Sequence, residues 1–301
     1  MLNIDTQGVK AMIKTCVSTY SFGWLRDESQ LGIYGVIDKA VEMGFDGIEF
    51  VDGGAVTLEN APKIKKYCED AKIALVNLCV GADFASEDKE KRRDEIRKAK
   101  ENVDLAAALG VPMMRHDAGY APFKRKYNTG FDSALSYMAQ AILEVTEYAQ
   151  ERGVRTLTEN HGFFSQDATR VEKLINAVGH PNFGALVDIG NFMCADEDST
   201  RSVGLMAPYA YHVHCKDFYW KSGMDIAPGD GWFQTRAGNY LRGAVVGFGA
   251  AKAAQSLQTL QRSGYDGYYS IEFEGGEDPL WGIQTSLANI KRFLSVQENE
   301  K

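Results

Sequence analysis

The sequence lacks any uninterrupted hydrophobic run long enough to span a bilayer, and its first residues, MLNIDTQGVKAMIK, hold no apolar core of signal-peptide length. We therefore expect neither a membrane anchor nor a secretion signal. No extended basic patch stands out, and the 301 residues carry a net charge of −8. Because polyanions are bound by clustered positive charge, nucleic acid and anionic membranes are not expected as partners.

Cysteine is scarce, with five residues at positions 16, 68, 79, 194 and 215 and no C-x-x-C spacing. An odd number of scattered cysteines favours reduced thiols and a cytoplasmic location over disulfides, and it argues against a structural zinc site. The sequence also has no low-complexity linker. We therefore expect one domain over residues 1–301, with the 45% hydrophobic content of a soluble globular protein.

What the sequence does contain is a recurring unit, in which a helix-like stretch closes on a glycine and a short β-rich run follows. The joint GFDGIEF at 44–50 is nearly repeated as GYDGYYSIEF at 264–273. Glycine just past a helix is a common left-handed cap, and runs rich in Val, Ile, Thr and Tyr favour strands. Helices alternating with short strands predict a parallel sheet with right-handed crossovers.

Eight strands are predicted in this way, at about 13–19, 44–49, 73–80, 110–116, 153–159, 179–188, 209–215 and 264–272. Eight βα units in a chain of this length indicate an α/β protein folded as a single (β/α)8 TIM barrel. The main rival is a doubly wound sheet, which would be expected to place a glycine-rich phosphate turn after the first strand. The aromatic stretch STYSFGWL at 18–25 stands there instead.

Polar residues fall at the carboxyl ends of six predicted strands: Glu49, His116, Glu159, Asp188, His214 and Glu272. A single acid at such a position could simply cap the next helix. Six together indicate more, because the carboxyl ends of barrel strands meet at one mouth, where barrel active sites are built. Their neighbours along each strand are mostly apolar, so alternation directs the carboxylates into the mouth.

Carboxylates crowded in this way repel one another unless a cation lies between them. The imidazole of His214 adds a nitrogen to the oxygen ligands, a set that suits Mn²⁺ first, and also Mg²⁺, Co²⁺ or Zn²⁺. In YHVHCKDF at 211–218, alternation puts His212 and Lys216 on the face of His214 and Cys215 on the other face. We expect His212, one step deeper, to be a hydrogen-bond donor behind the ligands.

Four motifs, TENHG, VDIGN, HVHCKD and YYSIEFEG, resemble the sugar phosphate isomerase/epimerase superfamily of xylose isomerase-like barrels. That group includes ketose 3-epimerases, hydroxypyruvate isomerases, inosose isomerases and dehydratases, and endonuclease IV. The resemblance implies one divalent ion held by Glu159, Asp188, His214 and Glu272. It also implies that Glu159 and Glu272 serve as the acid/base pair.

The sequence departs from two branches of that group. Many ketose epimerases carry a histidine three residues after the metal aspartate, where this chain has Asn191. Endonuclease IV relatives use additional histidines for three zinc ions, and this chain has only five histidines in all. An acidic chain with so few histidines does not fit DNA repair.

Three functions remain open at this stage. The first is a metal-dependent isomerase or epimerase acting on a sugar, keto-sugar or cyclitol through an enediolate. The second is a lyase or dehydratase acting on a keto-sugar or a 3-keto glycoside, including cleavage of a C-glycoside, and Asn191 favours it. The third is a carbohydrate-binding barrel without catalysis. In each case the partner is a small carbohydrate, and we expect a homo-oligomer, or a hetero-oligomer with a small subunit for a glycoside lyase.

His116 and His161 are alternative catalytic bases, although either could make only a structural hydrogen bond. The candidate substrate contacts are Glu49, His161, Asn191, Lys216 and Arg242. The segment 218–249 is longer than ordinary connections and rich in glycine and aromatics, so we expect an active-site loop that covers the mouth. Within it, GFGAAKA at 247–253 indicates either a backbone phosphate site or the start of a helix.

Overall fold

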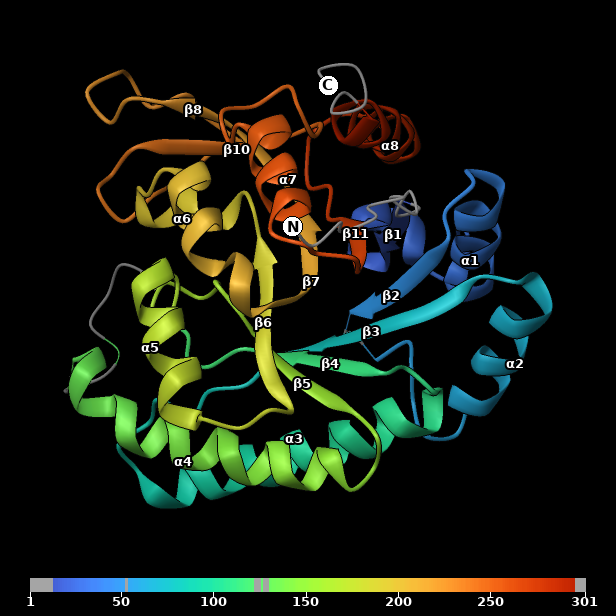
Figure 1. Ribbon diagram of the computed structural model, residues 1–301. Helices are drawn as coiled ribbons and strands as arrows, with labels where there is room; N and C mark the ends of the chain where they lie inside the picture. Colours follow the sequence, from blue (N-terminus) through green and yellow to red (C-terminus); the bar gives the residue numbers. More distant parts are fainter. Residues whose placement is uncertain (1–12, 52–53, 122–125, 127–129, 296–301) are drawn as a thin grey trace, which may run out of the picture.

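The computed structural model describes residues 13–51, 54–121, 126 and 130–295. Eight parallel strands close into a barrel in the order β1-β11-β7-β6-β5-β4-β3-β2 (Figure 1). The strands are β1 (Lys14–Ser18), β2 (Gly47–Val51), β3 (Ala74–Val80), β4 (Met113–His116), β5 (Arg155–Glu159), β6 (Phe183–Asp188), β7 (Ala210–Cys215) and β11 (Tyr268–Ile271). The predicted TIM barrel is confirmed, and each of its strands lies within a predicted range or within two residues of it.

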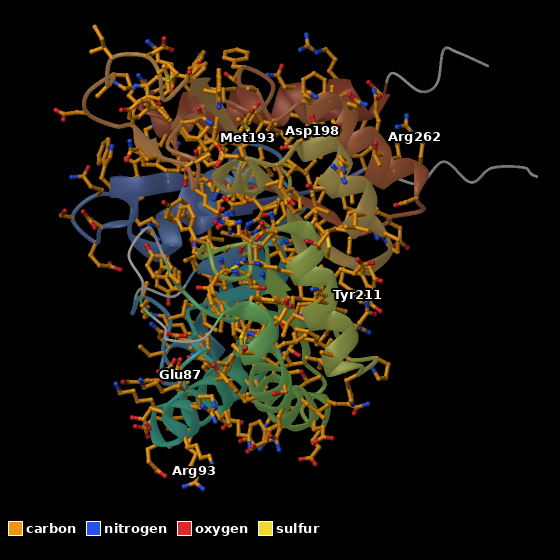
Figure 2. The ribbon with its side chains drawn as sticks, turned by 90° about the vertical axis from the view of Figure 1, so that its left-hand side faces the viewer. Glu87, Arg93, Met193, Asp198, Tyr211 and Arg262 are labelled. Carbon is orange, nitrogen blue, oxygen red and sulfur yellow. The ribbon has the colours of Figure 1, made fainter. Side chains whose placement is uncertain are left out.

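Helices surround the barrel, as the alternating pattern predicts. They are α1 (Gly32–Glu42), α2 (Ala61–Ala71), α3 (Lys89–Leu109), α4 (Phe131–Gln150), α5 (Ala168–Val178), α6 (Ser199–Met206), α7 (Ala253–Arg262) and α8 (Pro279–Ser295), with short 3-10 helices η1 (Thr19–Arg26), η2 (Asn191–Ala195) and η3 (Ala207–Tyr209). Arg93 in α3 and Arg262 at the end of α7 lie on opposite sides of the molecule (Figure 2). Gly110 ends α3 with a φ of 84°, the left-handed cap that glycine takes without strain.

Apolar side chains pack on both sides of the barrel wall, toward the helices and toward the barrel axis. The outward faces of the strands join the helices in one large apolar core, to which Phe50, Met114 and Val187 belong. Inside the barrel, Leu157 and Leu186 form a small separate apolar cluster. Each of these leucines lies two residues before a predicted metal ligand on the same face of its strand, so the ligands lie directly above an apolar layer.

Strand register brings the predicted ligands to one side of the mouth. Glu159 and Asp188 end β5 and β6, and Asp188 is paired directly with His214 of β7. Glu272 follows β11, where its amide donates to the carbonyl of Cys215 at 3.2 Å. Because β5, β6, β7 and β11 are consecutive around the barrel, the four side chains lie on neighbouring strands.

The segment predicted as a long loop is instead a small antiparallel sheet with strand order β8-β10-β9. Its strands are β8 (Asp217–Lys221), β9 (Phe233–Gln234) and β10 (Tyr240–Ala244). Figure 1 shows β8 and β10 projecting past α6. Phe218 and Leu241 attach this sheet to the barrel by packing with Met193 and Cys194 in a second apolar cluster.

A single carboxylate fastens the sheet to the start of α7. Asp217 accepts hydrogen bonds from the backbone amides of Phe218, Gly247, Gly249 and Ala251, at 2.9–3.0 Å. A Cβ on Gly249 would lie 2.3 Å from Asp217 Oδ1, so glycine is required there. The amides that a phosphate would need are therefore taken by an internal carboxylate. Of the two interpretations of GFGAAKA, the structure has the helix start.

The sequence predicts reduced cysteines and no membrane anchor. All five cysteines are buried and none forms a disulfide. Within the described residues, no helix has both the length and the apolar character needed to cross a membrane.

Replacing Asp217 tests this attachment. Asp217→Asn would set an amide NH₂ against two backbone N–H donors, and buried unsatisfied donors cost about 1–3 kcal/mol each. We expect the free energy of unfolding to fall by about 2–6 kcal/mol, with faster hydrogen exchange in β8 and β10. Asp225→Asn, an exposed change in the same segment, is the control. Equal stability of the two variants by chemical denaturation would contradict this role for Asp217.

Candidate active site

The four predicted metal ligands lie together at the mouth of the barrel. One donor atom from each of Glu159, Asp188, His214 and Glu272 lies within 4.8 Å of the others, and all four side chains are buried. His214 Nδ1 lies 3.4 Å from Glu272 Oε2 and 3.7 Å from Glu159 Oε1. It lies 3.9 Å from Asp188 Oδ2. Three carboxylates thus surround one ring nitrogen.

This arrangement fits a divalent cation. Asp188 Oδ2 and His214 Nδ1 are buried and make no hydrogen bond to the described residues. Buried polar atoms are normally paired, so two such atoms facing the same centre indicate a missing partner that accepts their lone pairs. Oxygen ligands with one imidazole suit Mn²⁺, Zn²⁺, Co²⁺ or Mg²⁺.

Electrostatics divide the carboxylates into two kinds. Burial raises the pKa of Asp188 to about 7 despite the attraction of Lys216, and repulsion from the neighbouring glutamates adds to the rise. Burial would also raise the pKa of Glu159, but the positive charge of Arg115 holds it well below its ordinary value. Glu159 therefore remains ionised because it has its own cation, whereas Asp188 is the carboxylate in greatest need of one.

Arg115, which the sequence analysis missed, forms that ion pair. Its guanidinium contacts Glu159 Oε2 through Nε and Nη2, and its Nη1 lies 3.5 Å from Asp117 Oδ1. Arg115 is paired with Leu157, which lies on the same inward face of β5 as Glu159. Alternation along MMRHD predicts that Arg115 and His116 face opposite ways. It does not predict which of the two faces the barrel mouth.

His116 is the residue that faces away. Its ring packs against Phe84 and Phe183, and its Nδ1 lies 3.0 Å from the carbonyl of Asp117. Burial lowers its pKa to about 4. The structure therefore places His116 between the barrel and the helices and does not bring it to the other candidate residues.

Lys216 and Asn191, predicted substrate contacts, lie against the ligands. Lys216 Nζ is 2.5 Å from Glu272 Oε2 and 3.5 Å from Asp188 Oδ2. Burial would lower the pKa of Lys216, but the carboxylates around it, that of Glu272 foremost, raise it well above its ordinary value. Asn191 Nδ2 donates to Glu159 Oε1 at 2.9 Å, and its Oδ1 accepts from Lys216 at 3.3 Å. Asn191 thus bridges a ligand and a cation.

His161 and Asp117 form a second polar pair beside the ligands. His161 Nδ1 lies 2.8 Å from Asp117 Oδ1. Burial would lower the pKa of His161, but the adjacent Asp117 raises it. The other edge of the ring faces a cavity, and the side chain is 38% exposed.

That cavity, of about 360 Å³, lies between the ligands and the small sheet. Its lining combines aromatic, polar and glycine positions: Tyr20, Tyr120, His161, Gly162, Phe163, Gln166, Asn191, Cys194, Lys216, Phe218, Gly231, Phe233, Gly243 and Glu274. Four of these residues, Phe218, Gly231, Phe233 and Gly243, come from the segment expected to cover the mouth. Glu274 connects the two sides, because its Oε2 lies 3.6 Å from Lys216 Nζ and accepts from the hydroxyl of Tyr20 at 3.5 Å.

Two predicted substrate contacts do not line this cavity. Glu49 is fully buried beneath the ligands, where it contacts His212 and His214. Arg242 lies on the face of β10 opposite to Leu241 and Gly243, and a Cβ placed on Gly276 would lie 2.9 Å from its guanidinium.

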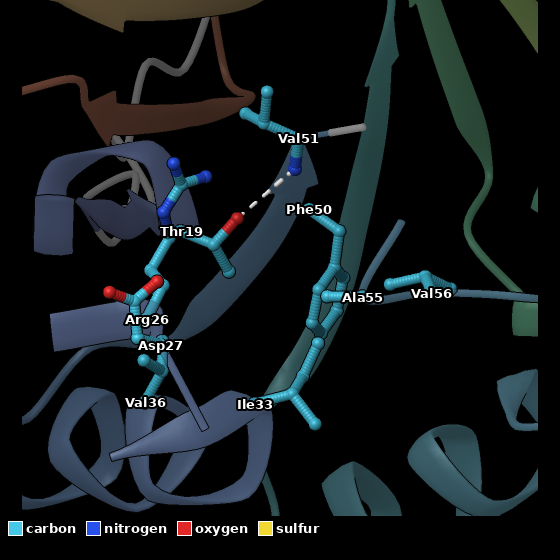
Figure 3. Close-up of a pocket in the computed structure, with 9 residues that line it drawn as sticks. All are labelled: Thr19, Arg26, Asp27, Ile33, Val36, Phe50, Val51, Ala55 and Val56. Atoms are coloured by element: carbon cyan, nitrogen blue, oxygen red, sulfur yellow. Dashed lines mark hydrogen bonds between the residues drawn. The ribbon is translucent and has the colours of Figure 1, made fainter. Parts of the chain in front are cut away.

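A smaller cavity, of about 150 Å³, lies beside the ends of β1 and β2 (Figure 3). Its lining is mostly apolar: Thr19, Arg26, Asp27, Ile33, Val36, Phe50, Val51, Ala55 and Val56. The amide of Val51 donates to Thr19 Oγ1 at 3.1 Å across one wall. Within the described residues, none that lines it forms a hydrogen bond or ion pair with a candidate ligand, whereas Lys216 and Asn191 of the larger cavity contact Glu272 and Glu159. The larger cavity is therefore the candidate active site.

Comparisons with known proteins find relatives and solved structures similar to this chain. The 3-oxo-isoapionate decarboxylase of Pectobacterium atrosepticum is 24% identical over 249 residues, which cover 81% of this chain and 80% of that protein. A probable ketose 3-epimerase of Synechocystis sp. is 20% identical over 253 residues, which cover 80% and 79%. The solved structure of the IOLI protein with a zinc atom matches with a TM-score of 0.75 at 17% identity, over 95% of this chain and all of that one.

A family model described as the xylose isomerase-like TIM barrel matches residues 37–293, which is most of the chain. This protein therefore belongs to the xylose isomerase-like TIM barrel family.

Proposed function

We propose that this protein is a divalent-metal-dependent isomerase or epimerase that acts on a sugar, keto-sugar or cyclitol. The observation that carries the proposal is the convergence of three carboxylates and one imidazole nitrogen next to Lys216 and Asn191, which line a cavity. A volume of about 360 Å³ suits a small molecule, and the aromatic walls suit the faces of a sugar ring. The comparison with a probable ketose 3-epimerase supports the same class.

The metal would be held by Glu159, Asp188, His214 and Glu272, with Mn²⁺ our first choice. The zinc atom in the IOLI structure supports Zn²⁺ as an alternative. When bound, the ion supplies Lewis-acid polarisation of a carbonyl group.

The protein's own carboxylates would move the proton. Both oxygens of Glu159 are engaged, one by Arg115 and one by Asn191, whereas Glu272 is the more exposed glutamate and contacts Lys216. We therefore assign Glu272 the removal of the proton from the carbon beside the carbonyl. Glu159 would deliver a second proton, taken up from solvent once substrate is bound, to the opposite face in an epimerase or to the neighbouring carbon in an isomerase. Glu272 would then release the first proton to solvent. General acid–base help of this kind contributes about 10²–10⁴-fold in rate.

Three further residues would bind the substrate. Lys216 and the exposed edge of His161 both face the cavity and can donate hydrogen bonds to hydroxyl groups. Asn191 fixes the position of Lys216 relative to Glu159, because it bonds to both. These residues would thus bind the substrate on the side of the cavity opposite to the small sheet.

A second candidate is a lyase or dehydratase acting on a keto-sugar or 3-keto glycoside. Asn191 favours it, because this side chain is bonded to Glu159 and Lys216 and offers no imidazole where many ketose epimerases have one. The similarity to a decarboxylase also supports chemistry that removes a group from the substrate. The epimerase or isomerase would act as a homo-oligomer, and a glycoside lyase could instead require a small partner subunit.

Metal content tests the ligand set. Wild-type protein should hold about one divalent ion per chain, and an Asp188→Ala, His214→Ala double variant should hold none after dialysis. Loss of two ligands should exceed the about 10–100-fold cost of losing a residue that only supports a ligand. His116→Gln is the matched control, since that ring faces away from the site. If elemental analysis still finds about one divalent ion per chain in the double variant, the assignment of these ligands is wrong.

Hydrogen exchange in D₂O tests the proton transfer. A substrate found by screening keto-sugars, cyclitols and keto-glycosides should gain deuterium at the carbon beside its carbonyl, or lose its β-substituent if the enzyme is a lyase. Glu272→Gln and Glu159→Gln should each slow exchange by about 10²–10⁴-fold, whereas His116→Gln should leave it intact. Turnover without any carbon–hydrogen cleavage would rule out the proton-transfer mechanism while leaving the metal site in place.

A further inference from the structure

Three fully buried polar side chains lie beneath the ligands, one each from β2, β3 and β7. We call Glu49, Asn77 and His212 the inner polar cluster. A buried carboxylate costs several kcal/mol unless it is paired and hydrogen-bonded. Glu49 is 0% exposed and borders no cavity of the candidate site, so contact with substrate does not account for it.

The contacts of Glu49 show what it does instead. His212 Nε2 lies 2.7 Å from Glu49 Oε2, and Asn77 Nδ2 donates to the same oxygen at 3.2 Å. The other oxygen, Oε1, lies 2.6 Å from Nε2 of His214. Both oxygens of Glu49 thus face nitrogen atoms, and the amide nitrogen of Asn77 can only donate, so the carboxyl group serves as an acceptor.

Glu49 Oε1 and His214 Nε2 lie 2.6 Å apart as a charge pair, although their geometry does not meet that of a hydrogen bond. A carboxylate oxygen only accepts, so a hydrogen on the facing nitrogen is what makes this close contact attractive. For His214 that nitrogen is Nε2. In the neutral ring the lone pair is then on Nδ1, the atom that lies among Glu272, Glu159 and Asp188. The tautomer that binds a cation is the one that Glu49 selects.

We infer that Glu49 is a positioning residue that fixes the tautomer and ring orientation of His214 and so sets the affinity of the metal site. The inference rests on the metal site of the proposed function. Asn77 and His212 hold one oxygen of Glu49, which leaves the other directed at His214. The inner polar cluster therefore acts on the metal through a single ligand.

The same residues allow a rival interpretation, in which Glu49, Cys79 and His214 hold a second ion. The sulfur of Cys79 already accepts from Asn77 Nδ2 at 3.2 Å. Glu49 Oε1 lies 2.6 Å from His214 Nε2, which leaves no room for an ion between these two atoms. These contacts favour the positioning role.

The first test measures the wild-type protein and uses a variant only to assign one signal. Wild-type protein labelled with ¹⁵N-histidine and loaded with Zn²⁺ reports the protonation of each ring nitrogen in two-bond ¹H–¹⁵N spectra, with His214 assigned by its loss in His214→Gln. We expect hydrogen on Nε2 of His214 and zinc on Nδ1. Hydrogen on Nδ1 with zinc on Nε2 would overturn the inference.

The second test is Glu49→Gln, which keeps the shape of the side chain. Two donors face Oε2 and one faces Oε1, so the amide oxygen should take the Oε2 position and its NH₂ should face His214. The hydrogen of His214 would then move to Nδ1, and Zn²⁺ affinity should fall about 10–100-fold, as for other residues that support a metal-binding histidine. A competing chelator measures this affinity without any activity assay.

Glu274→Gln is the matched control, because it removes one negative charge next to Lys216 without contacting His214. It should change Zn²⁺ affinity much less than Glu49→Gln does. Equal affinity of Glu49→Gln and wild type would overturn the positioning role while the proposed function stands. A wild-type protein that binds no divalent ion would instead remove the proposed function and this inference together.

Discussion

The repulsion among three carboxylates around His214 is the constraint on which the rest of the site depends. At an effective dielectric constant of about 20, two like charges 4 Å apart repel by about 4 kcal/mol. Two of the carboxylates have their own cation, which offsets this repulsion: Glu159 pairs with Arg115, and Glu272 pairs with Lys216. Asp188 shares only a longer contact with Lys216, so the remaining deficit of positive charge lies where a cation would bind.

The barrel interior is organised in layers along its axis. Leu157 and Leu186 fill the interior, and the inner polar cluster grips one ligand from beneath. The ligands follow at the strand ends, and the cavity and the small sheet lie above them. Each layer is contributed by several strands, so the layers are positioned by the hydrogen-bonded barrel and not by flexible connections.

Strand alternation and the convergence of strand ends were enough to predict the barrel and the residues that now lie within ligand distance of one another. The same two rules did not predict how deep Glu49 lies in the barrel, or which of Arg115 and His116 faces its interior. β2 continues past Glu49 to Val51 and has a register shift at Ile48/Glu49, so this residue lies deeper than its position in the sequence suggests. In the four-residue β4, Arg115 and His116 are both polar, and only the paired strand decides which faces inward. The pairing of Tyr240 with Lys221 joins distant residues, which local patterns do not reveal.

Four of the six residues from His212 to Asp217 have different structural roles, each at a different depth of the barrel. His212 belongs to the inner polar cluster, His214 faces the candidate metal, Lys216 balances charge at the cavity, and Asp217 fastens the small sheet. A point substitution removes one of these roles and leaves the others. Inserting or deleting one residue here would reverse the direction of every following side chain. A change of length just before His212 would turn the histidines toward the helices and the cysteine toward the metal, so it would remove all four roles together.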